Sequence, residues 1–254
     1  MCILFIAINQ HKDHPLIVAA NRDEFHQRPT KSAYFWADDN KLLAGQDLQA
    51  GGTWLGINPE GQFAAITNIR DPKNNNPKAK TRGELVPLAL QNNSPINESW
   101  LVANSDKYNP FNLIYSVNNQ LYCFNSANNE HKLLESGFHA ICNGSVNDVW
   151  PKMAKGEQLL EQLINEQQPV HAEHLFAIMQ DSTQAPDELL PNTGVGIDWE
   201  KLLSSIFITS PTYGTRSTSI LLQHQSGSID FSEQSYTSDG DIFNKKQFAL
   251  ANSN

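Results

Sequence analysis

Two residues near the start of the chain could together support nucleophilic chemistry, Cys2 and Asp23. Methionine aminopeptidases remove Met1 when the following residue is small, and cysteine qualifies. Removal would leave one residue that carries both a thiol and a free α-amine, with reference pKa values of about 8.5 and about 8. The amine could then accept the proton of the thiol, so that nucleophile and base belong to the same residue. The alternative is that Cys2 is a small buried hydrophobic residue at the start of a strand.

The carboxylate of Asp23 belongs to the tetrapeptide Asn21-Arg22-Asp23-Glu24, which ends an apolar run. Four successive polar groups at such a place must either meet solvent or form hydrogen bonds with one another. If residues 2–9 and 16–23 pair as an antiparallel hairpin, the paired residue numbers sum to about 25. We therefore expect Cys2 opposite Asp23. The alternative for this tetrapeptide is an ordinary turn with an exposed Arg–Asp ion pair.

Apolar runs and turn signals define the elements that must position these residues. We expect strands within residues 2–9, 16–20, 53–57, 62–67, 111–117, 121–125, 138–142, 205–209, 216–224 and 229–236. We expect helices at 150–168 and 171–180, and helix starts at the capping-box sequence Thr81-Arg82-Gly83-Glu84 and at Ser94-Pro95. The order of these elements predicts one α+β domain over residues 1–254, with two stacked antiparallel sheets and helices outside.

Composition excludes several classes of function. The chain has 254 residues, of which 18 are Lys or Arg and 27 are Asp or Glu, giving a net charge of −9. This balance is unfavourable for binding nucleic acid or anionic membrane surfaces. We expect no transmembrane segment, because no apolar run approaches the length of about 18 residues that a span requires. The cysteines, Cys2, Cys123 and Cys142, are odd in number, which favours a reducing cytoplasm. The oligomeric state is not defined by the sequence.

Several motifs spread over residues 1–222 resemble those of the NRDE-motif family, also called the transport-and-Golgi-organisation type. They are Met1-Cys2-Ile3, Asn21-Arg22-Asp23-Glu24-Phe25, Arg28-Pro29, Gly51-Gly52-Thr53-Trp54-Leu55-Gly56, Thr67-Asn68, Arg82-Gly83-Glu84-Leu85, Trp150-Pro151-Lys152 and Tyr213-Gly214-Thr215-Arg216-Ser217-Thr218-Ser219. The family is similar to the N-terminal-nucleophile hydrolases. That resemblance implies a four-layer αββα sandwich of two antiparallel sheets.

The choloylglycine-hydrolase and penicillin-acylase-like branch of those hydrolases implies roles for individual residues. Its nucleophile resembles Cys2, its aspartate resembles Asp23, and its late arginine resembles Arg216. Its two asparagines resemble Asn68 and Asn143, either of which would donate to an oxyanion. Both asparagines are also ordinary turn residues.

Three further residues are predicted to bind substrate. The branch has Arg-Asn-x-Asp where this chain has Asn21-Arg22-Asp23, so only the role of the aspartate can be carried over to this chain. We expect Asn21 and Arg22 to bind substrate. Arg82 belongs to a basic segment, residues 70–82, that is either a solvated loop or a site for an anionic ligand tail.

The resemblance implies a hydrolase that cleaves the carbon–nitrogen bond of a small-molecule amide or acyl ligand through an acyl-thioester on Cys2. No cofactor is implied. The pairs His11/His14 and His171/His174 lack a third ligand, so no metal site is expected. The alternative is a non-catalytic protein that binds and carries haem, lipid or acyl-CoA. A haem carrier would need an axial ligand, and the sequence places no histidine clearly in that role.

Overall fold

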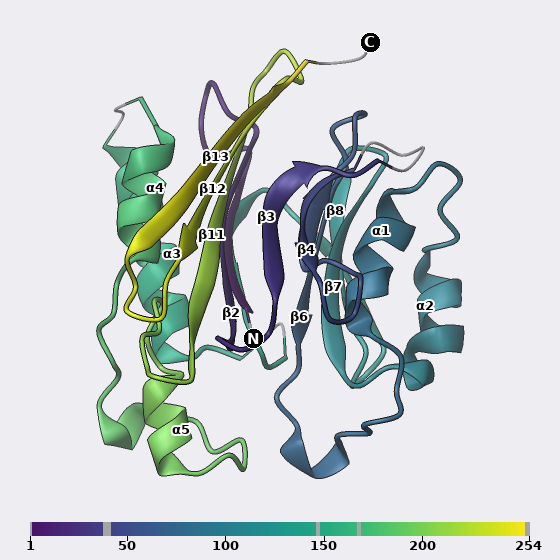
Figure 1. The fold of residues 1–254 in the computed structure, drawn as a ribbon. Helices are drawn as coiled ribbons and strands as arrows, with labels where there is room; N and C mark the ends of the chain where they lie inside the picture. Colours follow the sequence, from purple (N-terminus) through teal and green to yellow (C-terminus); the bar gives the residue numbers. More distant parts are fainter. Residues whose placement is uncertain (1, 38–41, 146–147, 167–168, 252–254) are drawn as a thin grey trace. The chain divides into compact units, whose positions relative to one another are not determined.

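A computed structural model describes residues 2–37, 42–145, 148–166 and 169–251. The described chain divides into two compact units, each with one antiparallel sheet (Figure 1). Unit 1 comprises residues within Met1–Gln27, Ser136–Cys142 and Asn147–Ala251. Unit 2 comprises residues within Arg28–Glu135 and Asn143–Val146. The chain therefore leaves unit 1 and returns to it more than once.

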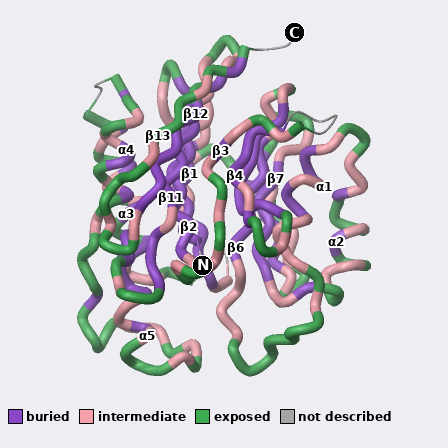
Figure 2. Tube along the Cα trace, viewed as in Figure 1, coloured by how far each residue is buried: buried purple, intermediate pink, exposed green. Residues whose placement is uncertain are grey.

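The sheet of unit 1 brings the first and last parts of the chain together. Its order is β10-β1-β2-β11-β12-β13, and every neighbouring pair is antiparallel. The strands are β1 (Cys2–Ile8), β2 (Leu16–Phe25), β10 (Gly137–Ile141), β11 (Tyr213–Gln223), β12 (Ile229–Tyr236) and β13 (Ile242–Leu250). β1 and β2 are interior strands and are buried along most of their length (Figure 2). This burial explains why β1 and the first half of β2 are continuously apolar instead of alternating.

Two helices, α3 (Pro151–Asn165) and α4 (Ala172–Met179), lie along one face of this sheet (Figure 1). Strand residues of one parity, such as Ile3, Phe5 and Ile17, pack there against Met153 and Leu160. The approach is close at Gly156, where an added Cβ would lie 1.9 Å from Cζ of Phe5. Unit 1 also contains α5 (Ile197–Leu202) and a 3₁₀ turn at Asp187–Leu189.

The sheet of unit 2 is a simple meander in which each strand pairs with the next along the chain. Its strands are β3 (Thr30–Phe35), β4 (Leu43–Asp47), β5 (Leu55–Ile57), β6 (Phe63–Asn68), β7 (Phe111–Val117), β8 (Gln120–Asn125) and β9 (Glu130–Leu134). Helix α1 (Leu85–Leu90) packs on β5, β6 and β7, and α2 (Glu98–Asn104) follows it. Short 3₁₀ turns cover Pro72–Asn74, Arg82–Glu84 and Ser105–Lys107.

Gly51 and Gly52, which precede β5, are required for different reasons. Gly51 has φ +80°, a conformation that favours glycine. A Cβ on Gly52 would lie 2.4 Å from the carbonyl carbon of Gly83, and the Gly83 oxygen accepts from the amide of Thr53. The following residue, Trp54, is buried in the core of unit 2.

The structure corrects three local predictions. Residues 205–209 are not a strand, because their backbone bonds irregularly, as when the Phe207 amide donates to the Asp181 carbonyl. The capping box does not form, since Thr81 makes no side-chain cap bond. Ser94 does not cap α2. That cap is Asn97, whose side chain accepts from the Trp100 amide.

The α+β class with two antiparallel sheets, each packed against helices, is confirmed. Among the described residues, no helix combines the length and apolar character needed to cross a membrane.

Candidate functional site

Cys2 begins β1 and lies inside the sheet of unit 1, between the strands β10 and β2. Its side chain is 8% exposed. Burial, together with the charge of Asp23, raises the pKa of its thiol to about 11, although the charge of Arg22 acts in the opposite direction. In this chain the sulfur is therefore a protonated thiol at neutral pH.

The register of β1 against β2 differs by one position from the prediction. Cys2 pairs with Arg22, so that the paired numbers sum to 24, and Asp23 is displaced to the next position. Side chains of directly opposed residues share a face of the sheet, and successive residues alternate. Cys2 and Arg22 therefore share one face, and Asp23 lies on the face that packs against the helices. The prediction that Asp23 stands beside the thiol is wrong in this respect.

Asp23 is fully enclosed, with 1% of its surface exposed. Its Oδ1 accepts a hydrogen bond of 2.8 Å from Oγ1 of Thr215. Burial raises the pKa of the Asp23 carboxyl, against the opposing effects of Lys152, Thr215 and Arg22. Lys152 is itself buried, in the first turn of α3. A carboxyl whose charge is poorly solvated and faces a buried cation is typical of a functional site.

A β-bulge in β11 arranges the third strand of the site. The register of β11 against β2 shifts between Thr215 and Ser217. Oγ1 of Thr215 bonds Asp23, and Oγ1 of Thr218 donates to Oδ1 of Asn21 at 2.6 Å. On a regular strand, residues three positions apart point to opposite faces. Thr215 and Thr218 point to the same face because one extra residue is inserted between them. The inserted residue is Arg216.

Arg216 is half-buried and is held by the main chain that follows β2. Its Nη1 donates to the carbonyl oxygens of Phe25 and His26, both at 3.0 Å. Burial lowers the pKa of its guanidinium, and the positive charge of Arg22 lowers it further. Two arginines are thus gathered at the end of the sheet where Cys2 lies.

Asn21 has a different environment from the one predicted for a substrate ligand. Its Nδ2 donates to the carbonyl oxygens of Met179 and Ile206, at 2.8 and 2.9 Å. Its Oδ1 accepts from Thr218, which in turn accepts from the hydroxyl of Tyr236. The side chain joins the strands to the end of α4 and to the 206 segment. Its role in substrate binding stays a prediction.

In unit 2, the structure brings Asn68 and Asn143 together. Nδ2 of Asn143 donates to Oδ1 of Asn68 at 3.2 Å and to its backbone oxygen at 2.9 Å. The backbone oxygen of Asn143 accepts from the Arg70 amide at 2.7 Å. Within the part of the chain that the structure describes, Nδ2 of Asn68 donates no hydrogen bond. Asn143 therefore orients Asn68, and Asn68 retains a donor for a ligand.

Arg82, also in unit 2, donates from Nη1 to the carbonyl oxygen of Pro110 at 3.0 Å. Lys80 forms an ion pair with Glu84, which also accepts from the hydroxyl of Tyr108. Part of the basic segment therefore bonds to the protein itself.

The structure thus places five predicted residues in unit 1: Cys2, Asn21, Arg22, Asp23 and Arg216. It places Asn68, Asn143 and Arg82 in unit 2. That both sets serve one site stays a prediction. Among the described residues, no three histidine, cysteine or acidic side chains are arranged to hold a metal ion.

Three residues of the site were not predicted from the sequence: Lys152, Thr215 and Thr218. Each of them lies in a motif that resembles those of the NRDE-motif family, but the motif gave no chemical role to these three side chains. The only local signal for the threonines was a run of small hydroxylated residues around Arg216.

Comparison with known proteins agrees with these observations. The family model described as Transport and Golgi organisation 2 matches residues 1–238. The human Transport and Golgi organization protein 2 homolog is 32% identical over 259 residues, covering 92% of this chain and 93% of the relative. The mouse homolog is 30% identical over 258 residues, with the same coverage.

Among solved structures, this chain resembles the C2A mutant of conjugated bile acid hydrolase from Clostridium perfringens. The TM-score is 0.50 at 9% identity, over 99% of this chain and 98% of that one. This likeness shows that the two chains share a fold. The extent of the family match and the identity to the curated relatives show that the chain belongs to the Transport and Golgi organisation 2 family.

Proposed function

We propose that this chain is an N-terminal-nucleophile hydrolase that cleaves a linear amide through an acyl-thioester on Cys2. One observation carries the proposal: a cysteine at position 2 begins an interior strand, with Arg22 paired to it and the buried Asp23 next along β2. A cysteine at position 2 is also the residue replaced in the C2A variant of the bile acid hydrolase.

Removal of Met1 is the activating step in this proposal. With the preceding residue in place, the thiol has a pKa of about 11 and very little thiolate at neutral pH. Hydrolysis of the Met1–Cys2 bond creates an α-amine on the same residue as the thiol. The amine takes the proton of the thiol, and the ammonium so formed stabilises the thiolate.

The thiolate then attacks the carbonyl carbon of the amide and forms a tetrahedral intermediate. We assign its oxyanion to Nδ2 of Asn68, with Asn143 as the residue that positions it. A donor of this kind contributes about 2.7–4 kcal/mol to the transition state. The ammonium of Cys2 returns its proton to the leaving nitrogen as the carbon–nitrogen bond breaks. Water then attacks the thioester, the amine accepts its proton, and a carboxylic acid leaves the regenerated thiol.

The charged residues have separate tasks in this scheme. Arg22 shares a sheet face with Cys2 and favours its thiolate. Asp23 lies on the other face, so we assign it to the main-chain amine and not to the sulfur. Arg216 is proposed to favour the thiolate electrostatically as well, and Arg82 and Asn21 are proposed to contribute to substrate binding. No cofactor takes part, and the site is proposed to work in the cytoplasm.

Mass spectrometry of the intact protein provides the test. The protein is mixed with fluorogenic amides of aminocoumarin that carry acyl chains of graded length, then quenched in acid. The expected result is a chain without Met1 that gains one acyl mass and releases aminocoumarin. Cys2→Ala should abolish both, whereas Cys142→Ala, which replaces another buried cysteine, should retain both.

A second variant isolates the processing step. A leucine inserted between Met1 and Cys2 prevents removal of methionine, and this chain should form no adduct. Adduct formation by the inserted chain, or by Cys2→Ala, would overturn the proposal. A protein that keeps Met1, turns over none of the amides and copurifies with a chromophore absorbing in the Soret region would instead favour the haem-carrying alternative.

A further inference from the structure

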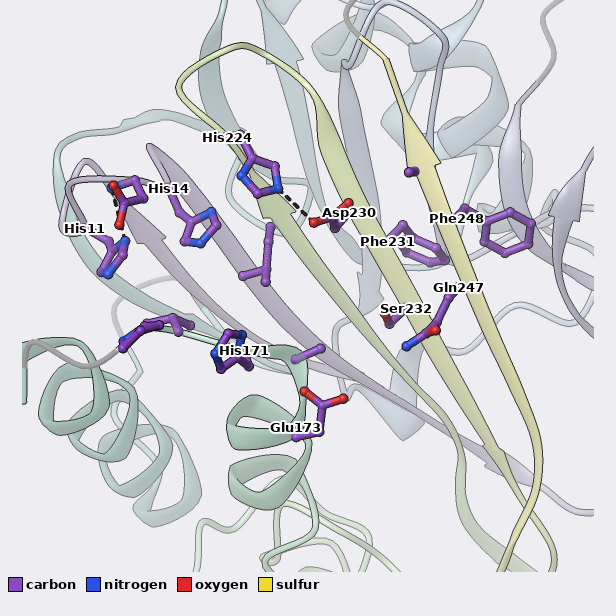
Figure 3. A pocket seen from close by; sticks show the side chains of 16 residues that line it. His11, His14, His171, Glu173, His224, Asp230, Phe231, Ser232, Gln247 and Phe248 are labelled. Carbon is purple, nitrogen blue, oxygen red and sulfur yellow. Dashed lines mark hydrogen bonds and ion pairs between the residues drawn. The ribbon is translucent and has the colours of Figure 1, made fainter.

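A pocket of about 580 Å³ lies in unit 1, at the opposite end of β1 and β2 from Cys2 (Figure 3). β1 separates its first residue from this end by roughly 20 Å, at 3.3 Å per residue. The pocket opens where the β1–β2 turn, the start of α4 and the β11–β12 turn meet over the helix-facing side of β12 and β13. Part of its wall, Gln247 and Ala249, lies beyond residue 238, where the family match ends.

The deep part of the pocket is apolar. Val170 and Leu222 belong to the hydrophobic core between the sheet and the helices, and both line the pocket. His14 is buried beside them and donates from Nδ1 to the carbonyl oxygen of Gln223 at 3.2 Å. This ring lies 5.1 Å from that of His11 and 4.8 Å from that of His224, between centroids. The floor therefore offers aliphatic and aromatic surface.

The rim is acidic. Asp13, Glu173 and Asp230 are all exposed and line the opening, each from a different element. His224 binds Asp230 at 2.8 Å, which leaves Asp13 and Glu173 to face a ligand. Among the described residues that line the pocket, none is lysine or arginine. The opening therefore presents carboxylates above an apolar floor.

We propose that this pocket binds an amphiphilic organic cation, a quaternary or protonated amine with a short apolar body. The apolar body lies against Val170 and Leu222, and the ammonium lies at the rim near Asp13 and Glu173. A cavity of 300–1,000 Å³ with apolar walls and a few convergent polar groups is typical of a small-molecule site. Aromatic ring faces also attract ammonium groups. An anionic ligand would meet the exposed carboxylates of Asp13 and Glu173 at the opening.

Hexyltrimethylammonium is the probe, compared with hexanesulfonate and 1-hexanol, which share its chain but not its charge. Binding is followed through the methyl resonances of Val170, Leu222 and Ala249 by NMR at pH 7.5 and low salt. The cation should shift these resonances in a saturable way and bind at least about tenfold more tightly than the anion, a difference of about 1.4 kcal/mol. Equal binding of the anion or of hexanol would overturn the charge preference.

Variants locate the site. Glu173→Gln should weaken binding of the cation about threefold, the effect of one exposed charge. Its control is Glu188→Gln, an exposed glutamate outside the pocket, which should bind normally. Ala249→Trp fills the pocket from an exposed strand position and should abolish binding, while Ala177→Trp on the exposed side of α4 should not. Unchanged binding in Ala249→Trp would overturn the assignment of the site.

This inference is independent of the proposed hydrolase. Cys2→Ala should leave the affinity for hexyltrimethylammonium unchanged, because the two sites lie at opposite ends of the strands. Loss of amide cleavage with retained binding of the cation, or the reverse, separates the two proposals.

Discussion

At the scale of single residues, the environment of Cys2 opposes the reactivity that its position implies. Burial favours the neutral thiol, and the pKa of about 11 expresses that preference. The positive charge of Arg22, which lies on the same sheet face, lowers the pKa of the thiol. This buried thiol gains a base when the chain is cut before it, so we infer that removal of Met1, and not the neighbouring charges, controls the nucleophile.

The chain that retains Met1 should therefore be alkylated slowly at Cys2. Iodoacetamide reacts with the thiolate, so the rate should rise about tenfold per pH unit between pH 7 and pH 10. Peptide mass spectrometry measures labelling at residue 2, and Arg22→Gln should slow it further at each pH. Rapid labelling that is complete at pH 7 would contradict the raised pKa.

Asp23→Asn should separate stability from function. Burial raises the pKa of the folded carboxyl above its unfolded value, so its favourable contribution belongs to acid pH and is lost as pH rises to neutrality. The neutral amide can still accept from Thr215. At pH 7.5 the variant should unfold in urea at a midpoint no lower than wild type, while amide cleavage falls about a hundredfold or more.

Asp47→Asn provides the contrast for that experiment. Asp47 pairs with Arg28 at 2.6 Å in unit 2, so loss of its charge removes a favourable contact. This variant should lower the unfolding midpoint. If both variants lose stability equally, the interpretation of Asp23 as a poorly solvated charge is incorrect.

At the scale of elements, one inserted residue determines which side chains of β11 reach β2. The bulge puts Thr215 and Thr218 on the same face, where they bond Asp23 and Asn21. The sequence around Arg216 shows small hydroxylated residues but not which of them is inserted. The register of β1 against β2 could not be predicted either. It depends on the turn after Ile8, where Asn9 has φ +54°.

Thr218→Val should destabilise the protein by about 1–3 kcal/mol. The change is nearly isosteric but removes the donor to Asn21 and the acceptor for the Tyr236 hydroxyl, and all these groups are buried. Urea unfolding measures the loss, with the exposed Thr183→Val as control. A loss below about 0.5 kcal/mol, which is the usual range for surface substitutions, would mean that water replaces the bonds.

Gly156→Ala tests the contact between α3 and β1. Alanine favours a helix by about 1 kcal/mol over glycine, so an exposed site would gain stability. Here the new Cβ would overlap the ring of Phe5, and we expect a loss of about 1–3 kcal/mol instead. Phe5→Leu in the same chain should recover part of the loss. Gain of stability in the single variant would show that the helix moves freely over the strand.

At the scale of the whole molecule, the sequence predicted the class of fold and most interior strands. The bounds expected for residues 111–117 and 229–236 match β7 and β12, because polar turns flank both segments. It missed β3, β9 and β13, which lie at sheet edges, and the short interior strand β4. Few residues of the three edge strands are buried, so their hydrophobic pattern is weak. Lys152 was missed as a site residue because a lysine at the start of a helix is usually solvated.

Acid should destabilise the whole protein partly through His14. Burial lowers the pKa of this imidazole, so the folded state resists a proton that the unfolded chain accepts. Stability is therefore retained above the unfolded pKa and falls as pH decreases through and below it. His14→Asn keeps a donor for the Gln223 carbonyl and should flatten the slope of unfolding free energy between pH 7.5 and pH 5. An unchanged slope would assign acid sensitivity elsewhere.

The central place of β2 has a consequence for how the protein is made. One partner of β2 is β11, which ends at residue 223, so the ribosome completes that partner about 200 residues later. At 5–20 residues per second, the first strands wait roughly 10–40 s for it. During that interval the nascent amino terminus is open to an aminopeptidase. Removal of Met1 therefore competes in time with completion of the sheet. Slower translation should lengthen the interval in which the aminopeptidase can act.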